Sequence, residues 1–299
     1  MTDEILRGLP APPPPGAAAL PPGTYAGQVV LVTGGGTGLG KAIAAEFARL
    51  GADLVIAGRR AGQLEAARGE LAAVPGAGRV AAAVCDIRDP ERVAEVFDAA
   101  AAALALPDVL VNNAAANFPC PAEDLSPNGW RAVVDITLTG TWFMTREFGR
   151  RHLAAGTPGS IVNIGASYAW TGGPGFAHSA AAKAGVKSLV ETLAVEWGPY
   201  GIQINGLVPG LFPHPDMTED IQDGLARAAP GSRDGRQPAL RVGEPHELGW
   251  AATFLASPYA RFVTGHTLVV DGANWQRRTL VGTDVVPVRE QLGRGPFTG

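Results

Sequence analysis

The sequence contains little cysteine, little net charge and no long hydrophobic run. Its 299 residues include two cysteines, Cys85 and Cys120. Two thiols cannot form the disulfide framework of a secreted domain, and we interpret them as packing residues in a reducing, cytoplasmic setting. The net charge of −4 supplies no basic field for a polyanion, so no nucleic acid partner is expected.

No stretch of about eighteen consecutive apolar residues occurs, so the sequence predicts no membrane-spanning helix. The opening segment, "MTDEILRGLPAPPPPGAAALPPGTY", carries Asp3 and Glu4 where a signal peptide has basic residues, and prolines interrupt it before an apolar core region can form. Proline runs favour an extended chain. We therefore expect residues 1–25 to be a flexible, proline-rich tail.

Apolar residues are abundant, at 46% of the chain, which is enough for one large core. From Gly27 onward, short β-branched runs alternate with Ala-rich and Leu-rich stretches of helical length. This alternation implies a parallel sheet buried on both faces, with right-handed crossovers. The predicted fold is α/β, a doubly wound parallel-sheet Rossmann fold. The expected strands are 29–34, 53–58, 79–86, 108–114, 160–165, 202–208 and 266–272, and the expected helices include 39–50, 61–73, 90–105, 129–154 and 180–197.

We expect a single domain over residues 26–275, followed by a C-terminal extension at 276–299 that has no clear period. Residues 211–241 are polar and broken by Pro and Gly between the sixth and seventh expected strands. Loops beyond the carboxyl edge of such a sheet carry ligand contacts. We therefore interpret 211–241 as a lid, and a plain surface excursion is the alternative.

A glycine-rich stretch, "TGGGTGLG" at 33–40, follows the first expected strand and opens the first expected helix. In that context glycines permit a tight turn, close approach of the backbone to a pyrophosphate, and close packing of helix on strand. The helix N-terminus adds unpaired N–H groups and a positive dipole end. We expect this turn to bind a dinucleotide through Gly34, Gly35, Gly36, Thr37, Gly38, Leu39 and Gly40.

The second expected strand ends in "AGRR", without the carboxylate that usually holds the ribose 2′-hydroxyl of NAD. Arg59 and Arg60 would attract a 2′-phosphate instead, so they favour NADPH or NADP⁺, although solvated arginines are the alternative. Further cofactor contacts are expected where the third and fourth strands end, at Asp86, Ile87, Asn113, Ala114 and Ala115.

Four features occur in a fixed order: the glycine-rich turn, "NNAA" at 112–115, a lysine at 183 on an expected helix, and "PG" at 209–210. Together they span about residues 27–275, and the set resembles the short-chain dehydrogenase/reductases. That resemblance implies that Lys183 holds the nicotinamide ribose. It also implies that the nicotinamide is lined by Pro209, Gly210, Leu211 and Phe212.

Three positions depart from the family's usual site for alcohols and carbonyls. Where the family keeps Tyr, Ser and Asn, this chain has Ser179, Ala166 and Thr137. One branch of the family, the 2,4-dienoyl-CoA reductases, also has Ser in place of that Tyr and keeps the Lys. This chain is similar to that branch in "NNAAANF", "LSPNGW", "GASYAW", "SAAAKAG" and "AVEWGPYG", which occur in the same order.

The narrower resemblance implies a role for each matched residue. Tyr168 and Asn117 would be catalytic, assisted by Ser179 and Lys183. An acyl-CoA would lie along Phe118, Ser126 and Arg88. The implied activity is NADPH-dependent reduction of a 2,4-dienoyl-CoA in fatty acid β-oxidation, without a metal, by a homotetramer built on the helices at 129–154 and 180–197.

Other interpretations stay open. The alternatives are a trans-2-enoyl-CoA reductase, a carbonyl or alcohol oxidoreductase with an unusual site, and a non-catalytic NADP-binding protein. The presence of Tyr168 and Lys183 disfavours the last of these. Ser179 is alternatively a helix N-cap, a position that favours Ser. We interpret His178 and His214 as structural or lid residues rather than bases.

Overall fold

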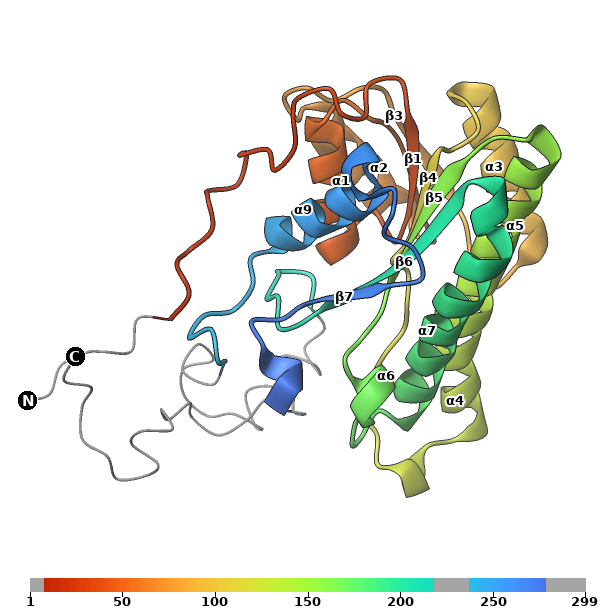
Figure 1. Ribbon diagram of the computed structural model, residues 1–299. Helices are drawn as coiled ribbons and strands as arrows, with labels where there is room; N and C mark the ends of the chain where they lie inside the picture. The colour runs from red at the N-terminus through yellow and green to blue at the C-terminus, as the bar shows by residue number, and fades with distance from the viewer. Residues whose placement is uncertain (1–7, 218–236, 278–299) are drawn as a thin grey trace, which may run out of the picture.

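The computed structural model describes residues 8–217 and 237–277. Within these residues, seven parallel strands form one sheet in the order β3-β2-β1-β4-β5-β6-β7, between two layers of helices (Figure 1). The order reverses beside β1, as the doubly wound Rossmann fold requires, and that prediction is confirmed. The strands are β1 (Val29–Thr33), β2 (Asp53–Gly58), β3 (Val80–Val84), β4 (Val109–Asn112), β5 (Gly159–Ile164), β6 (Ile202–Pro209) and β7 (Thr267–Val270).

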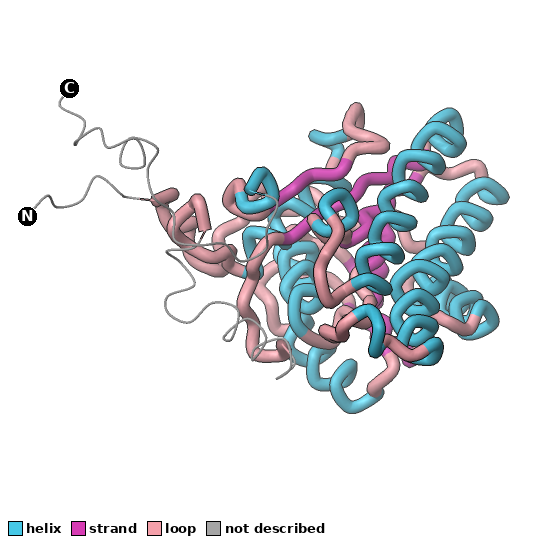
Figure 2. The backbone as a smooth tube through the Cα atoms, turned by 90° about the horizontal axis from the view of Figure 1, so that it is seen from below, coloured by secondary structure: helices cyan, strands magenta, loops and turns pink. Residues whose placement is uncertain are grey.

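Helices cover both faces of the sheet, and Figure 2 shows the strands running between them. Successive side chains of β1 point to opposite faces of the sheet. Val30 and Val32 pack in the core cluster on one face, and Leu31 packs in the cluster on the other. Full burial of one such side chain contributes about 1.5–3 kcal/mol. The first layer consists of α1 (Gly38–Arg49), α2 (Ala61–Ala72) and α9 (Pro245–Ala256), and the second of α3 (Pro90–Ala103), α5 (Thr141–Ala155) and α7 (Ala177–Trp197).

The expected strand boundaries differ from the observed ones by at most two residues at either end. The single helix expected at 129–154 is instead three segments, α4 (Pro127–Val134), the π-helix η2 (Asp135–Gly140) and α5. In this stretch the Thr141 hydroxyl donates to the Thr137 carbonyl at 2.8 Å. The Thr137 hydroxyl forms hydrogen bonds with the backbone of Ala116, in the loop that follows β4. The π-helix therefore contains the residue, Thr137, that contacts this loop. Short π-helical segments often lie at functional sites.

Several short elements were not expected. They are α6 (Tyr168–Thr171) and the 3₁₀ turns η1 (Ala122–Asp124), η3 (Gly198–Tyr200), η5 (Pro258–Ala260) and η6 (Asn274–Arg277). The longer helix α9 was also missed. Its sequence signal is a capping box in which Glu244 and Glu247 exchange backbone bonds, with Pro245 in the first turn, a pattern that marks helix starts.

The described part of the proline-rich segment contacts α9 and Ala239, which lies near the end of the expected lid. The indole of Trp250 donates to the Ala17 carbonyl at 3.0 Å, and His246 Nε2 lies 3.1 Å from the Pro13 carbonyl. The Leu9 amide donates to the Ala239 carbonyl at 2.8 Å. These hydrogen bonds tie residues 9–17 to the fold, although most of them are exposed. The division of the chain into tail, domain and extension stays a prediction. Most of the expected lid, at 218–236, and residues 278–299 of the extension lie outside the described residues.

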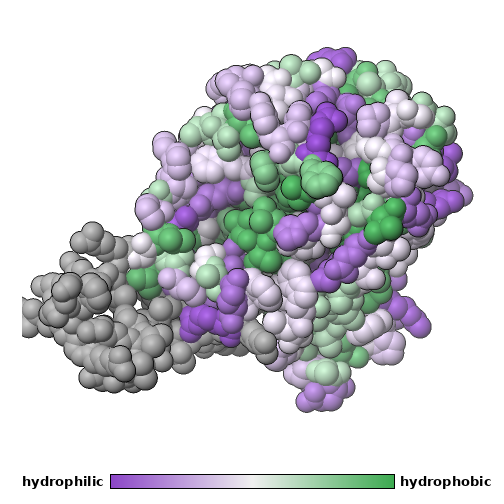
Figure 3. Space-filling view, viewed as in Figure 1, coloured by the Kyte–Doolittle hydropathy of each residue, from purple (hydrophilic) through white to green (hydrophobic). Residues whose placement is uncertain are grey.

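None of the described helices is long and apolar enough to cross a bilayer. On the face seen in Figure 3, polar and apolar side chains are interspersed. The carboxyl ends of β1 and β4 lie at the reversal of strand order, which is where ligands bind in this architecture.

Candidate active site

The ends of β1 and β4 are held together by side-chain hydrogen bonds. The Thr33 hydroxyl accepts from the backbone amides of Asn113 and Ala114, both at 3.0 Å. In return, the Asn113 amide group donates to the Thr33 carbonyl at 3.0 Å. These bonds hold the carboxyl ends of β1 and β4 at a fixed distance from each other.

The glycine-rich turn follows β1 and leads into the first residues of α1. Gly38 has φ +52°, a left-handed conformation that glycine adopts without strain. A Cβ on Gly40 would overlap the Gly34 carbonyl and the Asn113 side chain, so the helix can approach the strand only with glycine there. Gly35 faces inward, because its Cβ would lie 2.8 Å from the Ile56 side chain.

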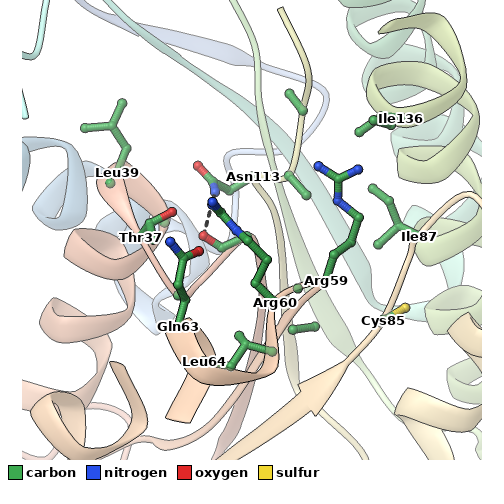
Figure 4. A pocket seen from close by; sticks show the side chains of 18 of the residues that line it. Thr37, Leu39, Arg59, Arg60, Gln63, Leu64, Cys85, Ile87, Asn113 and Ile136 are labelled. Carbon is green, nitrogen blue, oxygen red and sulfur yellow. Dashed lines mark hydrogen bonds between the residues drawn. The ribbon is translucent and has the colours of Figure 1, made fainter. Parts of the chain in front are cut away.

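A pocket of about 320 Å³ opens above this turn, and Figure 4 shows the side chains around it. Its volume lies within the usual range for ligand pockets. The expected cofactor residues that line it are Gly34, Gly36, Thr37, Gly38, Leu39, Gly40, Arg59, Arg60, Asp86, Ile87, Asn113, Ala114 and Ala115. Sequence reasoning missed Ala57, Gly58, Gln63, Leu64, Cys85, Ile136 and His214.

Positive charge gathers at the end of β2. Arg59 and Arg60 extend from it into the pocket and diverge from each other (Figure 4). The nearby carboxylate of Asp86 is held by Arg88, whose Nε lies 2.9 Å from Oδ1, and this bond lowers the pKa of Asp86. Arg88, expected along an acyl-CoA, therefore lies beside the cofactor pocket and is paired with Asp86.

An anionic oxygen already contacts the start of α1. The Gly38 amide donates to the carboxylate of Asp216 at 2.7 Å, and a Cβ on Gly38 would lie 2.9 Å from the His214 ring. The helix N-terminus favours negative charge through its unpaired N–H groups and its dipole. The carboxylate stands where a phosphate oxygen would bind, so the residues of this pocket fit a dinucleotide.

The candidate catalytic side chains converge from three separate segments. Tyr168 lies on α6, which ends at Thr171 and is followed by the C-cap Gly172 with φ +71°. The chain then returns so that the Phe176 ring stacks on the Tyr168 ring at 6.2 Å. The Tyr168 hydroxyl lies 2.9 Å from Ser179 Oγ, and Asn117 Nδ2 donates to the same hydroxyl at 3.4 Å.

Burial reinforces the protonated state of the Tyr168 phenol, whose ordinary pKa is already near 10. Desolvation raises the pKa of the Tyr168 phenol, an effect that the bond to Ser179 opposes. The phenol is therefore protonated and able to donate at neutral pH. Lys183 lies one turn beyond Ser179, is buried, and donates to the Ile164 carbonyl at 2.5 Å. Burial lowers the pKa of Lys183 to about 8.

Other expected residues have structural contacts of their own. Ser179 is the third residue of α7, whose N-cap is Phe176, so the N-cap interpretation of Ser179 is wrong. Ser126 is the residue that caps a helix, because its hydroxyl accepts from the Gly129 amide at 3.0 Å at the start of α4. Phe118 packs edge-on against the His178 ring.

Residues 209–212, at the end of β6 and directly after it, do not line the pocket of the glycine-rich turn. Pro209 ends β6 and pairs with Val270 of β7, and the Gly210 amide donates to the Val270 carbonyl. Leu211 and Phe212 are buried and line a second cavity of about 390 Å³ beside β7. Lys183 also lies outside the lining of the first pocket.

Nothing in the described residues groups three or more His, Cys, Asp or Glu side chains for a metal ion. Cys85 lines the cofactor pocket, and burial raises the pKa of its thiol to about 11. Only the thiolate is a good nucleophile. Cys85 is therefore a packing thiol at neutral pH.

Taken together, a glycine-rich turn at the reversal of a parallel sheet, with a buried lysine and a phenol beyond it, defines a nucleotide-dependent oxidoreductase of the Rossmann class. A family model described as enoyl-(acyl carrier protein) reductase matches residues 34–273. The chain belongs to the short-chain dehydrogenase/reductase family, whose cofactors are nicotinamide dinucleotides, and it is an oxidoreductase.

Similar proteins carry more specific names. A Bacillus subtilis (strain 168) protein named "probable 2,4-dienoyl-CoA reductase [(2E)-enoyl-CoA-producing]" is 39% identical over 249 residues, which cover 83% of this chain and 96% of that protein. A Caenorhabditis elegans protein with the same enzyme name, but "(3E)-enoyl-CoA-producing", is 38% identical over 251 residues, covering 84% of this chain and 81% of that one.

A solved structure described as a short chain dehydrogenase from Bacillus anthracis has a TM-score of 0.73 and 38% identity, and covers 83% of this chain and 96% of that one. Together with the named relatives, it confirms the expected resemblance to the 2,4-dienoyl-CoA reductase branch.

Proposed function

We propose that this chain reduces 2,4-dienoyl-CoA thioesters with NADPH. One observation carries the proposal. The Tyr168 hydroxyl lies within hydrogen-bond reach of both Asn117 and Ser179, whereas Ser179 occupies the family's usual tyrosine position, four residues before Lys183. The phenol is present in the site, but it comes from α6 instead of α7.

The displaced phenol suits a conjugated thioester better than a ketone. In a carbonyl, the carbon that accepts hydride and the oxygen that gains charge are about 1.2 Å apart. In a dienoyl thioester the accepting carbon is at the far end of the conjugated system, roughly 5 Å or more from the oxygen along the chain. The hydrogen-bond donor for that oxygen must therefore lie farther from the nicotinamide.

NADPH, when bound, supplies the hydride. The chain's own residues stabilise the charge that the substrate gains. Tyr168 and Asn117 donate to the thioester oxygen, and one such preorganised donor is often worth about 3 kcal/mol. The raised pKa of Tyr168 keeps its proton in place as the donor, and Ser179 orients the phenol. A proton from solvent then reaches carbon and completes the reduction.

The carbon that takes this proton decides the product. Protonation at C4 leaves a 2-enoyl thioester, and protonation at C2 leaves a 3-enoyl thioester. The names of the two relatives include one product each. We infer no preference for this chain, and product analysis in the assay below distinguishes the two.

The preference for NADPH rests on Arg59 and Arg60. Both point into the pocket, and the one nearby carboxylate among the described lining residues, Asp86, is already paired with Arg88. A charge-assisted phosphate contact contributes about 1.5–3 kcal/mol, so NADPH should bind on the order of tenfold more tightly than NADH. Calorimetric titration of both cofactors tests this preference, and equal affinities would contradict it.

We also propose a homotetramer built on α4, α5 and α7. The large apolar side chains of Trp130, Leu153 and Val195 are exposed on these helices, and exposed apolar groups of this kind favour association. Light scattering measures the mass directly, and a monomer would contradict the proposal. The cytoplasmic compartment stays a prediction.

The activity is tested by following NADPH oxidation with three substrates: a 2,4-dienoyl-CoA, a trans-2-enoyl-CoA and a simple ketone. The dienoyl-CoA should be reduced with the highest kcat/KM. Faster turnover of the enoyl-CoA or the ketone would transfer the assignment to those alternatives. NADPH binding without turnover of any substrate would favour a non-catalytic protein.

A further inference from the structure

His178 is buried at the start of α7 and uses its ring to cap the helix. Its exposed fraction is 0%, and its Nδ1 accepts from the Ser179 amide at 2.7 Å. The first amides of a helix have no partner within the helix. The N-cap residue, Phe176, supplies no side-chain acceptor, so the imidazole takes that role for the residue that contacts Tyr168.

The same ring also contacts the loop that carries Asn117. The Phe118 and His178 rings meet edge-on, with centroids 4.6 Å apart and an interplanar angle of 76°. Phe118 also fills the space beside α4, because a Cβ on Gly129 would lie 3.2 Å from its Cζ. The loop is thus held between α4 and α7 directly next to the Asn117 side chain.

A backbone bond reinforces this junction. The Cys120 amide donates to the Gly175 carbonyl at 2.8 Å, which joins the Asn117 loop to the turn before α7. The His178 side chain contacts Phe118, the residue next to Asn117, and the backbone amide of Ser179. It therefore lies between the two segments that supply the partners of Tyr168. Displacement of either partner would change the two short distances to the Tyr168 hydroxyl.

We propose that His178 is a positioning residue that sets the spacing between Asn117, Tyr168 and Ser179. The inference rests on the proposed function, since it assumes that these groups share one substrate oxygen. His178 acts through its neighbours and takes no proton from the substrate.

This role defines which nitrogen of the ring carries the proton. Nδ1 accepts a hydrogen bond, so the neutral ring has its proton on Nε2, an atom that is buried without a hydrogen-bond partner among the described residues. Burial lowers the pKa of His178, against a smaller opposing effect of the Phe176 carbonyl. The ring is therefore neutral at neutral pH.

Two substitutions separate the two contacts of the ring. His178→Asn keeps an acceptor near the position of Nδ1 but removes the ring, and His178→Phe keeps a ring but removes the acceptor. Each variant is made in the natural chain and in a Tyr168→Phe background. Their kcat for a 2,4-dienoyl-CoA and their Kd for NADPH are then measured.

In the natural chain each variant should lower kcat by about tenfold or more, since small displacements of catalytic groups are costly. The Kd for NADPH should change by less than about twofold. In the Tyr168→Phe background the further loss should be at most about threefold, because the central donor is already gone. Equal losses in both backgrounds, no loss in the natural chain, or a parallel rise in Kd would overturn the positioning role.

Nitrogen-15 NMR of the histidine rings provides a readout that needs no substrate. The chain has five histidines, and the signal missing from His178→Asn identifies this ring. The Nε2–H form is expected, and an Nδ1–H form would overturn the capping contact. If the natural enzyme reduces no dienoyl-CoA while the Nε2–H form is present, the proposed function has failed and the capping contact stands.

Discussion

The pocket of the glycine-rich turn and the proposed catalytic group are built in different ways. Six residues of one continuous stretch, Gly34 and 36–40, line the pocket. In this stretch a Cβ on Gly34, Gly38 or Gly40 would meet neighbouring atoms too closely. The catalytic group instead joins side chains of Asn117, Tyr168 and Ser179 from three segments. We therefore expect cofactor binding to depend on backbone shape in the first region, and the proposed chemistry to depend on single polar atoms in the second.

This difference separates the expected effects of substitution. An added methyl group in the glycine-rich turn should weaken cofactor binding and leave the catalytic atoms in place. Removal of one hydroxyl or amide from the catalytic group should slow turnover and leave cofactor binding unchanged. A substitution that changed the Kd for the cofactor and kcat to the same extent would contradict this difference between the two regions.

The largest effect is expected at Asn117. Asn117→Ala removes one donor to the substrate oxygen and should lower kcat by roughly 10²- to 10³-fold, with the Kd for NADPH unchanged. Combined with Tyr168→Phe, it should cost less than the two separate losses together, because both donors serve one oxygen. Steady-state kinetics of the four proteins measures this coupling. Strict additivity would show that the two residues act on different atoms.

A smaller effect is expected in the glycine-rich turn. Gly40→Ala places a Cβ against the Gly34 carbonyl and the Asn113 side chain, and overpacking of this kind costs about 1–3 kcal/mol. The Kd for NADPH should rise by about 10- to 100-fold, as calorimetry would show. Gly69→Ala on α2 is the matched control, since its Cβ meets nothing within 4 Å. An unchanged Kd in Gly40→Ala would mean that the turn does not shape the pocket.

We expect cofactor use to depend on pH through Lys183. Its folded-state pKa is lowered to about 8, so the ammonium is present below that pH and is lost as the pH rises through it. If the charged form is needed, kcat/KM for NADPH should fall by about tenfold per pH unit above this value. The pH–rate profile measures this fall. Lys187, which is paired with Glu191, is the control, since Lys187→Met should keep the same profile. A flat profile to pH 10 would contradict the role of Lys183.

The smallest effect is expected at Asp216. Its carboxylate accepts a hydrogen bond from the Gly38 amide. A phosphate could bind this amide only after the carboxylate has moved away. Exposed charged contacts contribute only about 0.2–1 kcal/mol, so Asp216→Ala should lower the Kd for NADPH by about threefold. Asp98→Ala removes the same charge from α3, where Asp98 pairs with Arg151, and should leave the Kd unchanged. Weaker binding in Asp216→Ala would reverse this interpretation.

The same contrast explains how much of the molecule could be predicted from its sequence. The strands and the glycine-rich turn are local patterns, so their positions follow from runs of neighbouring residues. Tyr168 and Asn117 are separated by 51 positions, and only the resemblance to a known branch joined them. The contact of Asp216 with Gly38 spans 178 positions and has no pattern that periodicity could reveal. The capping box of α9 was a local signal that could have been used.

The central claim is that the hydroxyl of Tyr168, rather than that of Ser179, stabilises the substrate oxygen. It is tested most directly by kcat for a 2,4-dienoyl-CoA at saturating NADPH in Tyr168→Phe and Ser179→Ala. Tyr168→Phe should lose roughly 10²- to 10³-fold, whereas Ser179→Ala should lose about tenfold, because Ser179 only orients the phenol. Near-normal turnover in Tyr168→Phe together with its abolition in Ser179→Ala would contradict the account.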